Sequence, residues 1–224
     1  MPIVVAFISQ KGGVGKSTLA RALLAVAAHS MKVRLADLDP RQGAVAAWQR
    51  TRQRHATAPA CEVIAYRSAS EALAASEDVE LLIIDTPAGT NRATLEIARQ
   101  AHLVVQPSGA SADDLVPAVL TFHELVKEGV PKERLAMAVS RVLAPSEEAT
   151  IRAYVGEAGY EVFAGSIGER IAYREAQNRG RAITETTQAK LNEAAETLIE
   201  SLLDKVTAEI NRRAAGTRTA KEGA

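Results

Sequence analysis

The chain has 224 residues, of which 47% are apolar and only 4% aromatic. This length suits one compact domain, and the composition favours helices packed on an aliphatic sheet over an aromatic platform that stacks nucleic-acid bases. Lys and Arg together number 27, as do Asp and Glu, so the formal net charge is zero and a globally basic nucleic-acid binder is excluded.

Three features bear on the compartment of the protein. Cys61 is the single cysteine, which excludes an internal disulfide and a multi-cysteine metal site and fits a reducing compartment. The apolar run at the start is too short for a secretory signal and has no basic region before it. No later run approaches the ~20 apolar residues that span a bilayer. We therefore expect a soluble, cytoplasmic protein.

Strand-like and helix-like segments alternate along the chain. Apolar runs predict strands at 3–9, 32–37, 62–66, 79–85, 101–106, 135–140 and 161–164. Helical patterns predict helices at 17–30, 44–55, 70–76, 112–129, 147–158, 170–178 and 186–213. Ser70 is expected to cap the third helix, Pro107 to end the fifth strand, and Pro117 to be tolerated near the start of the fourth helix.

These elements predict the fold class. Continuous apolar strands are buried on both faces, and strands separated by helices form βαβ units with a parallel sheet. We expect an α/β fold: a mostly parallel twisted sheet flanked by helices on both faces. One domain is expected over residues 1–211, followed by a flexible basic tail at 212–224. In such sheets, ligands bind outside the carboxyl ends of the strands.

The segment SQKGGVGKST, residues 9–18, follows the first predicted strand and opens the first helix. Its glycines let backbone N–H groups turn toward anionic oxygens, and the helix N-terminus adds partial positive charge. Lys16 is expected to reach the β- and γ-phosphates and Ser17 to ligate Mg²⁺. The other interpretation is a glycine-rich turn without a ligand. The usual first glycine of a phosphate loop is Gln10 here, and Lys11 is an added charge.

Three aspartates lie at the ends of predicted strands. Asp85 closes the run VELLIID, where a carboxylate can hold Mg²⁺ through water; the alternative is a carboxylate that caps a turn. Asp37 and Asp39 lie two residues apart, so an extended backbone places them on one face. A metal or water role is plausible there, and helix capping before residues 41–43 is the alternative.

Several segments resemble one known family in the same order along the chain. KGGVGKST resembles the deviant Walker A motif of the ParA/MinD family of ATPases. LADLDPRQGA (35–44), LLIIDTPAG (81–89), LVVQPSGASADDL (103–115) and IGERIAYREAQNRGRAI (167–183) resemble later segments of that family. The resemblance spans most of the chain and is closest to a short ParA-type partition ATPase without an N-terminal DNA-binding domain.

The resemblance implies that the chain binds ATP and Mg²⁺ and forms a sandwich dimer with two nucleotides between the subunits. It implies that Lys11 contacts the phosphates in the partner's site and Lys16 those in its own. The nucleotide-binding residues would be Lys11, Gly12, Gly13, Val14, Gly15, Lys16, Ser17 and Thr18.

The resemblance also implies roles around the metal. Ser17 would ligate Mg²⁺ directly, Asp37 and Asp85 would hold metal-bound waters, and Asp39 would orient the attacking water. Lys11, Lys16 and Asp39 would be the catalytic residues, since phosphoryl transfer depends on positioned cations and an oriented nucleophile.

The sequence departs from the family pattern at three places. Arg41 stands where the family usually has glutamine, and Ala88 replaces a second proline. Ser140 and Arg141 occupy a place where an asparagine often contacts adenine. These departures affect the adenine contacts and the switch geometry more than the phosphate site.

Four functions remain open. The first is a partition ATPase with weak basal activity, which binds non-specific DNA in the ATP state, associates with the nucleoid and is stimulated by a ParB-type or other small partner. The second is a MinD-like membrane-surface ATPase. The third, a nitrogenase-type reductase, is disfavoured because Cys61 alone cannot supply a bridging cluster. The fourth is a non-enzymatic scaffold, disfavoured by the complete set of phosphate-site residues.

Local patterns favour the partition ATPase with no membrane partner. The apolar stripe of the last helix (Leu191, Ala195, Leu198, Leu202, Val206, Ile210) is expected to dock on the core rather than on a membrane. Because nothing precedes the first strand, we expect no operator-specific binding.

Three basic clusters are candidates for contacts with DNA phosphates, although each equally fits a solvated face. One cluster contains Arg41, Arg50, Arg52 and Arg54. The second contains Arg170, Arg174, Arg179 and Arg181, and the third contains Arg212, Arg213, Arg218 and Lys221. We rank the last two first, partly because the resemblance places DNA contacts toward the C-terminal end.

Overall fold

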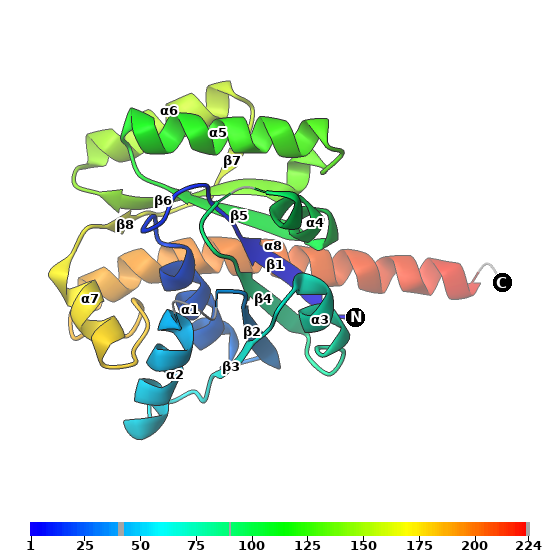
Figure 1. Cartoon of the computed structure of the whole chain (residues 1–224), viewed down its shortest axis with the longest axis horizontal. Helices are drawn as coiled ribbons and strands as arrows, with labels where there is room; N and C mark the ends of the chain where they lie inside the picture. Colours follow the sequence, from blue (N-terminus) through cyan, green and yellow to red (C-terminus); the bar gives the residue numbers. More distant parts are fainter. Residues whose placement is uncertain (40–42, 90, 223–224) are drawn as a thin grey trace.

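A parallel β-sheet forms the centre of the molecule (Figure 1). The computed structural model describes residues 1–39, 43–89 and 91–222, with side chains described as far as residue 213. The strands follow the spatial order β3-β2-β4-β1-β5-β6-β7, and β8 pairs with β6 off this path. The strands are β1 (Ile3–Phe7), β2 (Val33–Asp37), β3 (Glu62–Ala65), β4 (Leu81–Asp85), β5 (Leu103–Ser108), β6 (Leu135–Val142), β7 (Glu161–Val162) and β8 (Ile167–Gly168).

Helices cover both faces of this sheet and bury it in two apolar clusters. The helices are α1 (Lys16–Ala27), α2 (Ala44–Arg54), α3 (Ala69–Ala74), α4 (Arg92–Gln100), α5 (Ala112–Lys127), α6 (Pro145–Glu157), α7 (Ile171–Asn178) and α8 (Ala189–Glu222). One cluster joins the sheet to α1, α2, α7 and α8, and the other joins it to α3, α4, α5 and α6. Alternate residues of β1 enter opposite clusters, which explains its uninterrupted apolar sequence.

Every described strand pairing is parallel, so the predicted fold class is confirmed. The carboxyl ends of β1, β2 and β4 lie together at the centre of one edge, because β4 pairs with both β1 and β2. This edge is where the glycine loop and the aspartates were expected to meet.

Four local predictions need correction. The helix α4 was not predicted; Asn91 caps it by accepting a hydrogen bond from the backbone N–H of Thr94. The strand β5 continues past Pro107 to Ser108, because its pairing with β6 runs through Ser108, whereas its pairing with β1 ends at Val105, before the residue that lacks an N–H. Ser68, not Ser70, caps α3, and the short strand β8 was also missed.

The last helix docks on the core, as the apolar stripe predicted. Ala195, Leu198, Leu202 and Val206 are buried in the cluster that contains α1. The helix begins at Ala189 and continues to Glu222, beyond the predicted boundary, and its C-terminal part projects past the sheet (Figure 1). The division of the chain at residue 211 stays a prediction. Among the described residues, no helix is both long and apolar enough to cross a membrane.

Candidate nucleotide site

The glycine loop joins the end of β1 to the start of α1. Gly15 is the N-cap of α1 and has φ of 108°, a left-handed conformation that only glycine adopts without strain. No side chain caps the helix, so its first N–H groups remain open to a ligand. Gly13 also has a positive φ, 76°. The backbone therefore has the form of an anion-binding loop.

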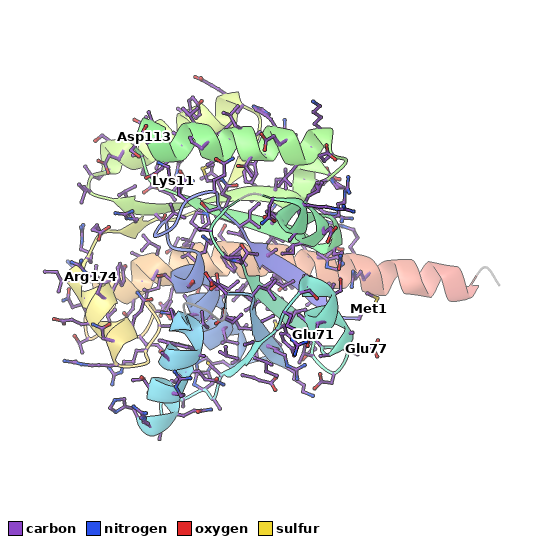
Figure 2. All side chains as sticks on the ribbon, in the orientation of Figure 1. Met1, Lys11, Glu71, Glu77, Asp113 and Arg174 are labelled. Carbon is purple, nitrogen blue, oxygen red and sulfur yellow. The ribbon has the colours of Figure 1, made fainter. Side chains whose placement is uncertain are left out.

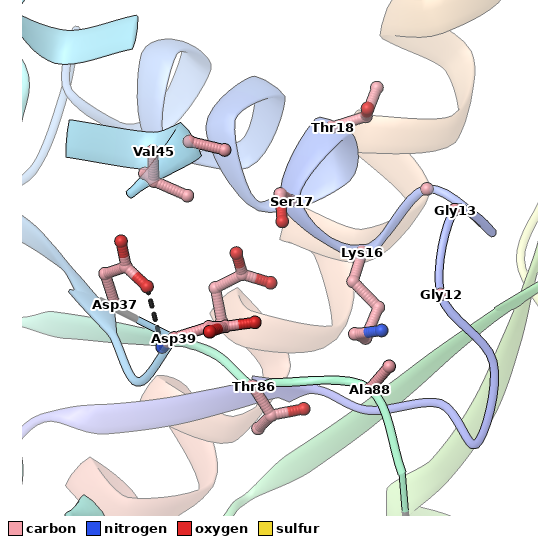
Figure 3. A pocket seen from close by; sticks show the side chains of 13 residues that line it. Gly12, Gly13, Lys16, Ser17, Thr18, Asp37, Asp39, Val45, Thr86 and Ala88 are labelled. Atoms are coloured by element: carbon pink, nitrogen blue, oxygen red, sulfur yellow. Dashed lines mark hydrogen bonds between the residues drawn. The ribbon is translucent and has the colours of Figure 1, made fainter. Parts of the chain in front are cut away.

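A cavity of about 220 Å³ lies in front of this loop (Figure 3). The loop side of its lining is formed by Gly12, Gly13, Gly15, Lys16, Ser17 and Thr18. The opposite side is formed by Asp37, Asp39, Ala44, Val45, Asp85, Thr86 and Ala88. Of the predicted phosphate-site residues, only Lys11 and Val14 are not part of this lining.

Two buried carboxylates face each other across neighbouring strands. Asp37 ends β2 and Asp85 ends β4, and the two residues are register partners, 1% and 3% exposed. Asp37 Oδ2 and Asp85 Oδ1 have no hydrogen-bond partner in the described part of the chain. Buried polar atoms without partners are rare, and two such oxygens side by side fit a cation or its bound waters.

Burial raises the pKa of both carboxyl groups. For Asp85 it reaches about 6, with the Ser17 hydroxyl opposing the shift and the charge of Asp37 adding to it. For Asp37 the main cause is again burial, opposed by the N–H of Asp39. The described residues hold no cluster of three or more side chains of the usual metal-binding types. Mg²⁺ would thus take only part of its shell from the protein and the rest from phosphates and water.

Lys16 lies between the carboxylates and the loop (Figure 3). Its Nζ donates to the backbone oxygen of Lys11 at 3.2 Å, which directs the amine into the cavity. Burial lowers the pKa of Lys16, while the charges of Asp85 and Asp39 raise it. The amine thus lies beside the carboxylates of Asp85 and Asp39, and the cavity leaves space for an anion to bind to it.

Asp39 sits at the rim, where β2 leaves the sheet. Its N–H donates to Asp37 Oδ1 at 2.8 Å, shown as the dashed line in Figure 3. This bond fixes the backbone between the two acids, so the Asp39 carboxylate can face the cavity while Asp37 lies deeper. Arg41, named above as a basic residue and a departure from the family, lies outside the described residues.

Lys11 points away from the cavity. Its Nζ lies 3.1 Å from Asp114 Oδ1 in the first turn of α5, and its side chain is 42% exposed. Figure 2 shows Lys11 beside the N-terminal end of α5. The two lysines of the loop thus lie in different surroundings: Lys16 is directed into its own site and Lys11 to the surface.

Sequence reasoning missed two side chains behind the loop. Gln177 Oε1, on α7, accepts hydrogen bonds from Thr18 Oγ1 at 3.2 Å and from Arg21 Nη1 at 3.1 Å. The charge of Arg21 lowers the pKa of both Asp37 and Asp85, against the effect of burial. The available signal for Arg21 was a lone arginine within the apolar part of α1, four residues after Ser17.

A second cavity of about 220 Å³ adjoins the first and shares Gly13, Gly15 and Thr18 with it. Ser140 and Arg141 contribute to its lining. The Ser140 hydroxyl donates to the Val14 carbonyl at 2.8 Å, and Arg141 pairs with Glu169 at 3.1 Å. Ser140 therefore holds the glycine loop beside this second cavity.

The candidate DNA-binding arginines occupy two separate regions. Arg170, Arg174, Arg179 and Arg181 are exposed along α7 and the residues that flank it. Arg212 pairs with Glu209, and Arg213 contacts His102 at the other end of the molecule. The structure does not bring the two predicted clusters together.

A phosphate-type loop between a central parallel strand and a helix, with carboxylates at the ends of adjacent strands, defines the class of P-loop nucleotide-binding proteins. Residues 5–183 match the family model described as the CobQ/CobB/MinD/ParA nucleotide binding domain, and the chain belongs to this family. It is therefore a nucleotide-binding protein of the ParA/MinD type, a family of ATPases.

Individual relatives agree with this assignment. The chain is 27% identical over 197 residues to the maintenance of carboxysome distribution protein A of Gloeobacter kilaueensis, covering 86% of this chain and 89% of the relative. The apo McdA structure from Cyanothece has a TM-score of 0.69 at 20% identity and covers 90% of this chain and 100% of its own.

A plasmid partition protein of Borrelia burgdorferi bound to AMPPNP has a TM-score of 0.71 at 17% identity, covering 92% of this chain and 100% of its own. At identities this low, the two structural likenesses show the fold alone.

Proposed function

We propose that this chain is an ATP-dependent dimerising ATPase of the ParA type that positions a plasmid, chromosome or other large cargo. The observation that carries the proposal is that the two lysines of the glycine loop point in different directions. Lys16 is directed into its own cavity and Lys11 is held at the surface, where a second subunit can meet it. The names of the relatives, which include carboxysome distribution and plasmid partition, support a role in positioning.

Each side chain has a role that its position supports. When bound, Mg²⁺ would supply charge neutralisation on the phosphates; Ser17, Asp37 and Asp85 would hold it, directly or through water. Lys16 would bind the phosphates in its own site, and the loop N–H groups would cradle them. Asp39, at the rim, would orient water for attack on the terminal phosphate.

Dimerisation would complete the site. In the subunit described here, Lys11 is paired with Asp114, so it has to exchange that carboxylate for the phosphates of the partner's nucleotide. A cation supplied from a second subunit stabilises the charge of the transition state, as an arginine finger does. Binding of ATP and association of the subunits would thereby be thermodynamically coupled.

The proposal includes binding of non-specific DNA in the ATP state, location at the nucleoid and stimulation by a ParB-type or other small partner. A MinD-like function at a membrane surface is the weaker candidate. The apolar stripe of α8 packs against the core, with only its two end residues Leu191 and Ile210 partly exposed, so it is not free to lie in a lipid interface.

The test is ATP hydrolysis and oligomeric state measured together on the purified full chain. We expect slow hydrolysis that requires Mg²⁺, and dimers with ATP but not with ADP. Lys16→Ala should abolish both, Lys11→Ala should abolish ATP-dependent dimers, and Asp39→Ala should retain dimers and lose hydrolysis. Hydrolysis that is unchanged in both Lys11→Ala and Asp39→Ala would refute the mechanism.

A further inference from the structure

Five exposed arginines on α2 and around α7 lie in one region of the surface, although the two segments are far apart in sequence. They are Arg50 and Arg54 on α2, Arg174 on α7, and Arg179 and Arg181 after it. Figure 1 shows α2 and α7 next to each other, and Figure 2 shows Arg174 directed away from the body. We refer to this set of five as the arginine face.

Gly180 joins the two halves of the arginine face. It has φ of 72°, and a Cβ added to it would come within 2.2 Å of the backbone nitrogen of Arg52. The loop backbone therefore rests directly on α2. Because Arg179 and Arg181 flank Gly180, both lie against the helix that carries Arg50 and Arg54.

Side chains of α2 fix this contact. The buried Arg52 guanidinium binds both carboxylate oxygens of Glu185 at 2.6 and 2.7 Å and donates to the Gly180 carbonyl at 3.2 Å. Trp48 Nε1 donates to the Arg181 carbonyl at 2.9 Å. The Arg52 guanidinium also lies 5.4 Å from the centre of the Trp48 ring. The two halves are thus held as one rigid surface.

The arginine face gathers in one region five exposed cations without ion pairs among the described residues. Several exposed cations elsewhere on the molecule do have carboxylate partners: Lys32 with Asp78, Arg92 with Glu96, Arg99 with Glu128, Arg212 with Glu209. None of the five arginines has such a partner within the described residues, and α2 contains no acid at all. Glu185 is neutralised by Arg52, which leaves Glu175 as the exposed acid on α7. Unpaired guanidinium groups at this density attract a polyanion.

We propose that the arginine face binds the phosphate backbone of duplex DNA, with α2 contributing as much as α7. The inference rests on the proposed function and gives its DNA-binding step a location. Backbone binding is favoured over base stacking because Trp48 is only 3% exposed and the face presents cations instead. Arg212 and Arg213 are excluded from this surface because they lie in contact with Glu209 and His102.

Both halves of the arginine face are connected to the nucleotide site. Ala44 and Val45, at the start of α2, line the cavity in front of the glycine loop. On the other side, Gln177 of α7 accepts a hydrogen bond from Thr18 of the loop helix. A change in the occupant of the cavity is therefore transmitted to both halves, which gives DNA binding a route to depend on ATP.

The test compares two double variants with the same charge change. Arg50→Gln with Arg54→Gln alters the α2 half of the face. Arg92→Gln with Arg99→Gln alters α4, on the opposite face of the sheet, and serves as the control. Binding of the full chain to a random-sequence DNA duplex is measured with ATP and Mg²⁺ between about 50 and 300 mM salt.

We expect the α2 variant to bind at least tenfold more weakly, with a slope of log affinity against log salt smaller by about 2, and the control to bind like the parent. Equal affinity and slope in the α2 variant and the parent would overturn the assignment. Poly-L-glutamate that competes as well as duplex DNA would overturn it too, in favour of an acidic protein partner.

ATP hydrolysis and dimerisation of the same samples separate the two proposals. A parent chain that dimerises and hydrolyses ATP without binding DNA refutes the arginine face and leaves the ATPase intact. A parent chain that does neither refutes the proposed function itself.

Discussion

In the proposed mechanism, the ion pair between Lys11 and Asp114 has to open before Lys11 reaches the nucleotide of a second subunit. Partly exposed pairs of this kind contribute about 0.2–1 kcal/mol. Removing the acid by Asp114→Ala should therefore lower the ATP concentration needed for half-maximal dimerisation by about 1.4- to fivefold. Light scattering during an ATP titration measures this shift.

The neighbouring acid supplies the control. Asp113 lies in the same first turn of α5, where it adds the same charge at the helix N-terminus without being the partner of Lys11. Asp113→Ala should leave the midpoint of the titration unchanged. If the two variants move it equally, general electrostatics accounts for the effect and the pair does not restrain Lys11.

His102 makes the stability of the molecule depend on pH. Its Nδ1 accepts a hydrogen bond from the Val4 N–H at 2.9 Å, and burial, with the charge of Arg213, lowers its pKa to about 4. Since the unfolded imidazole titrates near 6.5, the unfolded chain binds more protons between these values. The contribution of His102 to folding stability should fall by about 1–2 kcal/mol as the pH drops from 7 to 5, whereas Asp85, whose pKa burial raises, contributes in the opposite direction.

Chemical denaturation at several pH values checks this dependence. His102→Gln keeps an acceptor for Val4 but does not titrate, so the stability of the parent relative to this variant should fall over the same range. His29→Gln, at an exposed position, should follow the parent curve. A difference in stability between the parent and His102→Gln that stays constant from pH 7 to 5 would contradict the assignment.

At the scale of elements, Gly180 determines how α7 and its following loop sit on α2. Gly180→Ala combines an unfavourable positive φ with a backbone clash against Arg52, so it should destabilise the protein by about 2 kcal/mol or more. Gly156 offers a matched comparison, since it lies within α6 with nothing near its added Cβ. Gly156→Ala should stabilise the protein by up to about 1 kcal/mol. Thermal melts of both variants distinguish the two effects.

The elements that the sequence predicted well are those with local signals. Strands buried on both faces, such as Leu81–Asp85, have continuous apolar runs that few other structures explain. The helix α4 was not predicted because its many polar residues hide the helical spacing of its apolar ones, although Asn91 and Thr94 form a capping box. The prediction that Pro107 ends its strand was wrong because β5 can include a proline once its pairing with β1 has ended, and the sequence does not state where β1 ends.

At the scale of the whole molecule, the phosphate side of the site was predictable because one segment of ten residues carries it. The rest depends on contacts between distant parts of the chain. Lys11 meets Asp114 103 positions away, and Arg21 meets Gln177 156 positions away. No periodicity or motif links such residues, so only the fold places Arg21 behind the carboxylates and Asp114 over the loop.

We expect the facing carboxylates of Asp37 and Asp85 to make the stability of the whole molecule depend on Mg²⁺. Because burial raises the pKa of Asp85 to about 6, ionising it costs the folded state free energy as the pH rises from about 4 to 6. At pH 7 Asp85 is ionised in the metal-free protein, so this free energy lowers the folding stability in full. ATP with Mg²⁺ should raise the melting temperature more than ATP with EDTA, since the cation offsets the buried charges.

Asp85→Asn removes the charge and nearly preserves the shape. The metal-free variant should melt several degrees higher than the parent, while the additional stabilisation by Mg²⁺ and the ATPase activity should both be lost. Calorimetry with and without Mg²⁺ measures the melting temperature of the metal-free protein and its increase on binding of Mg²⁺. A variant that melts lower than the parent in the absence of metal would show that the Asp85 carboxylate stabilises the fold, and the cation would then have no buried repulsion to relieve.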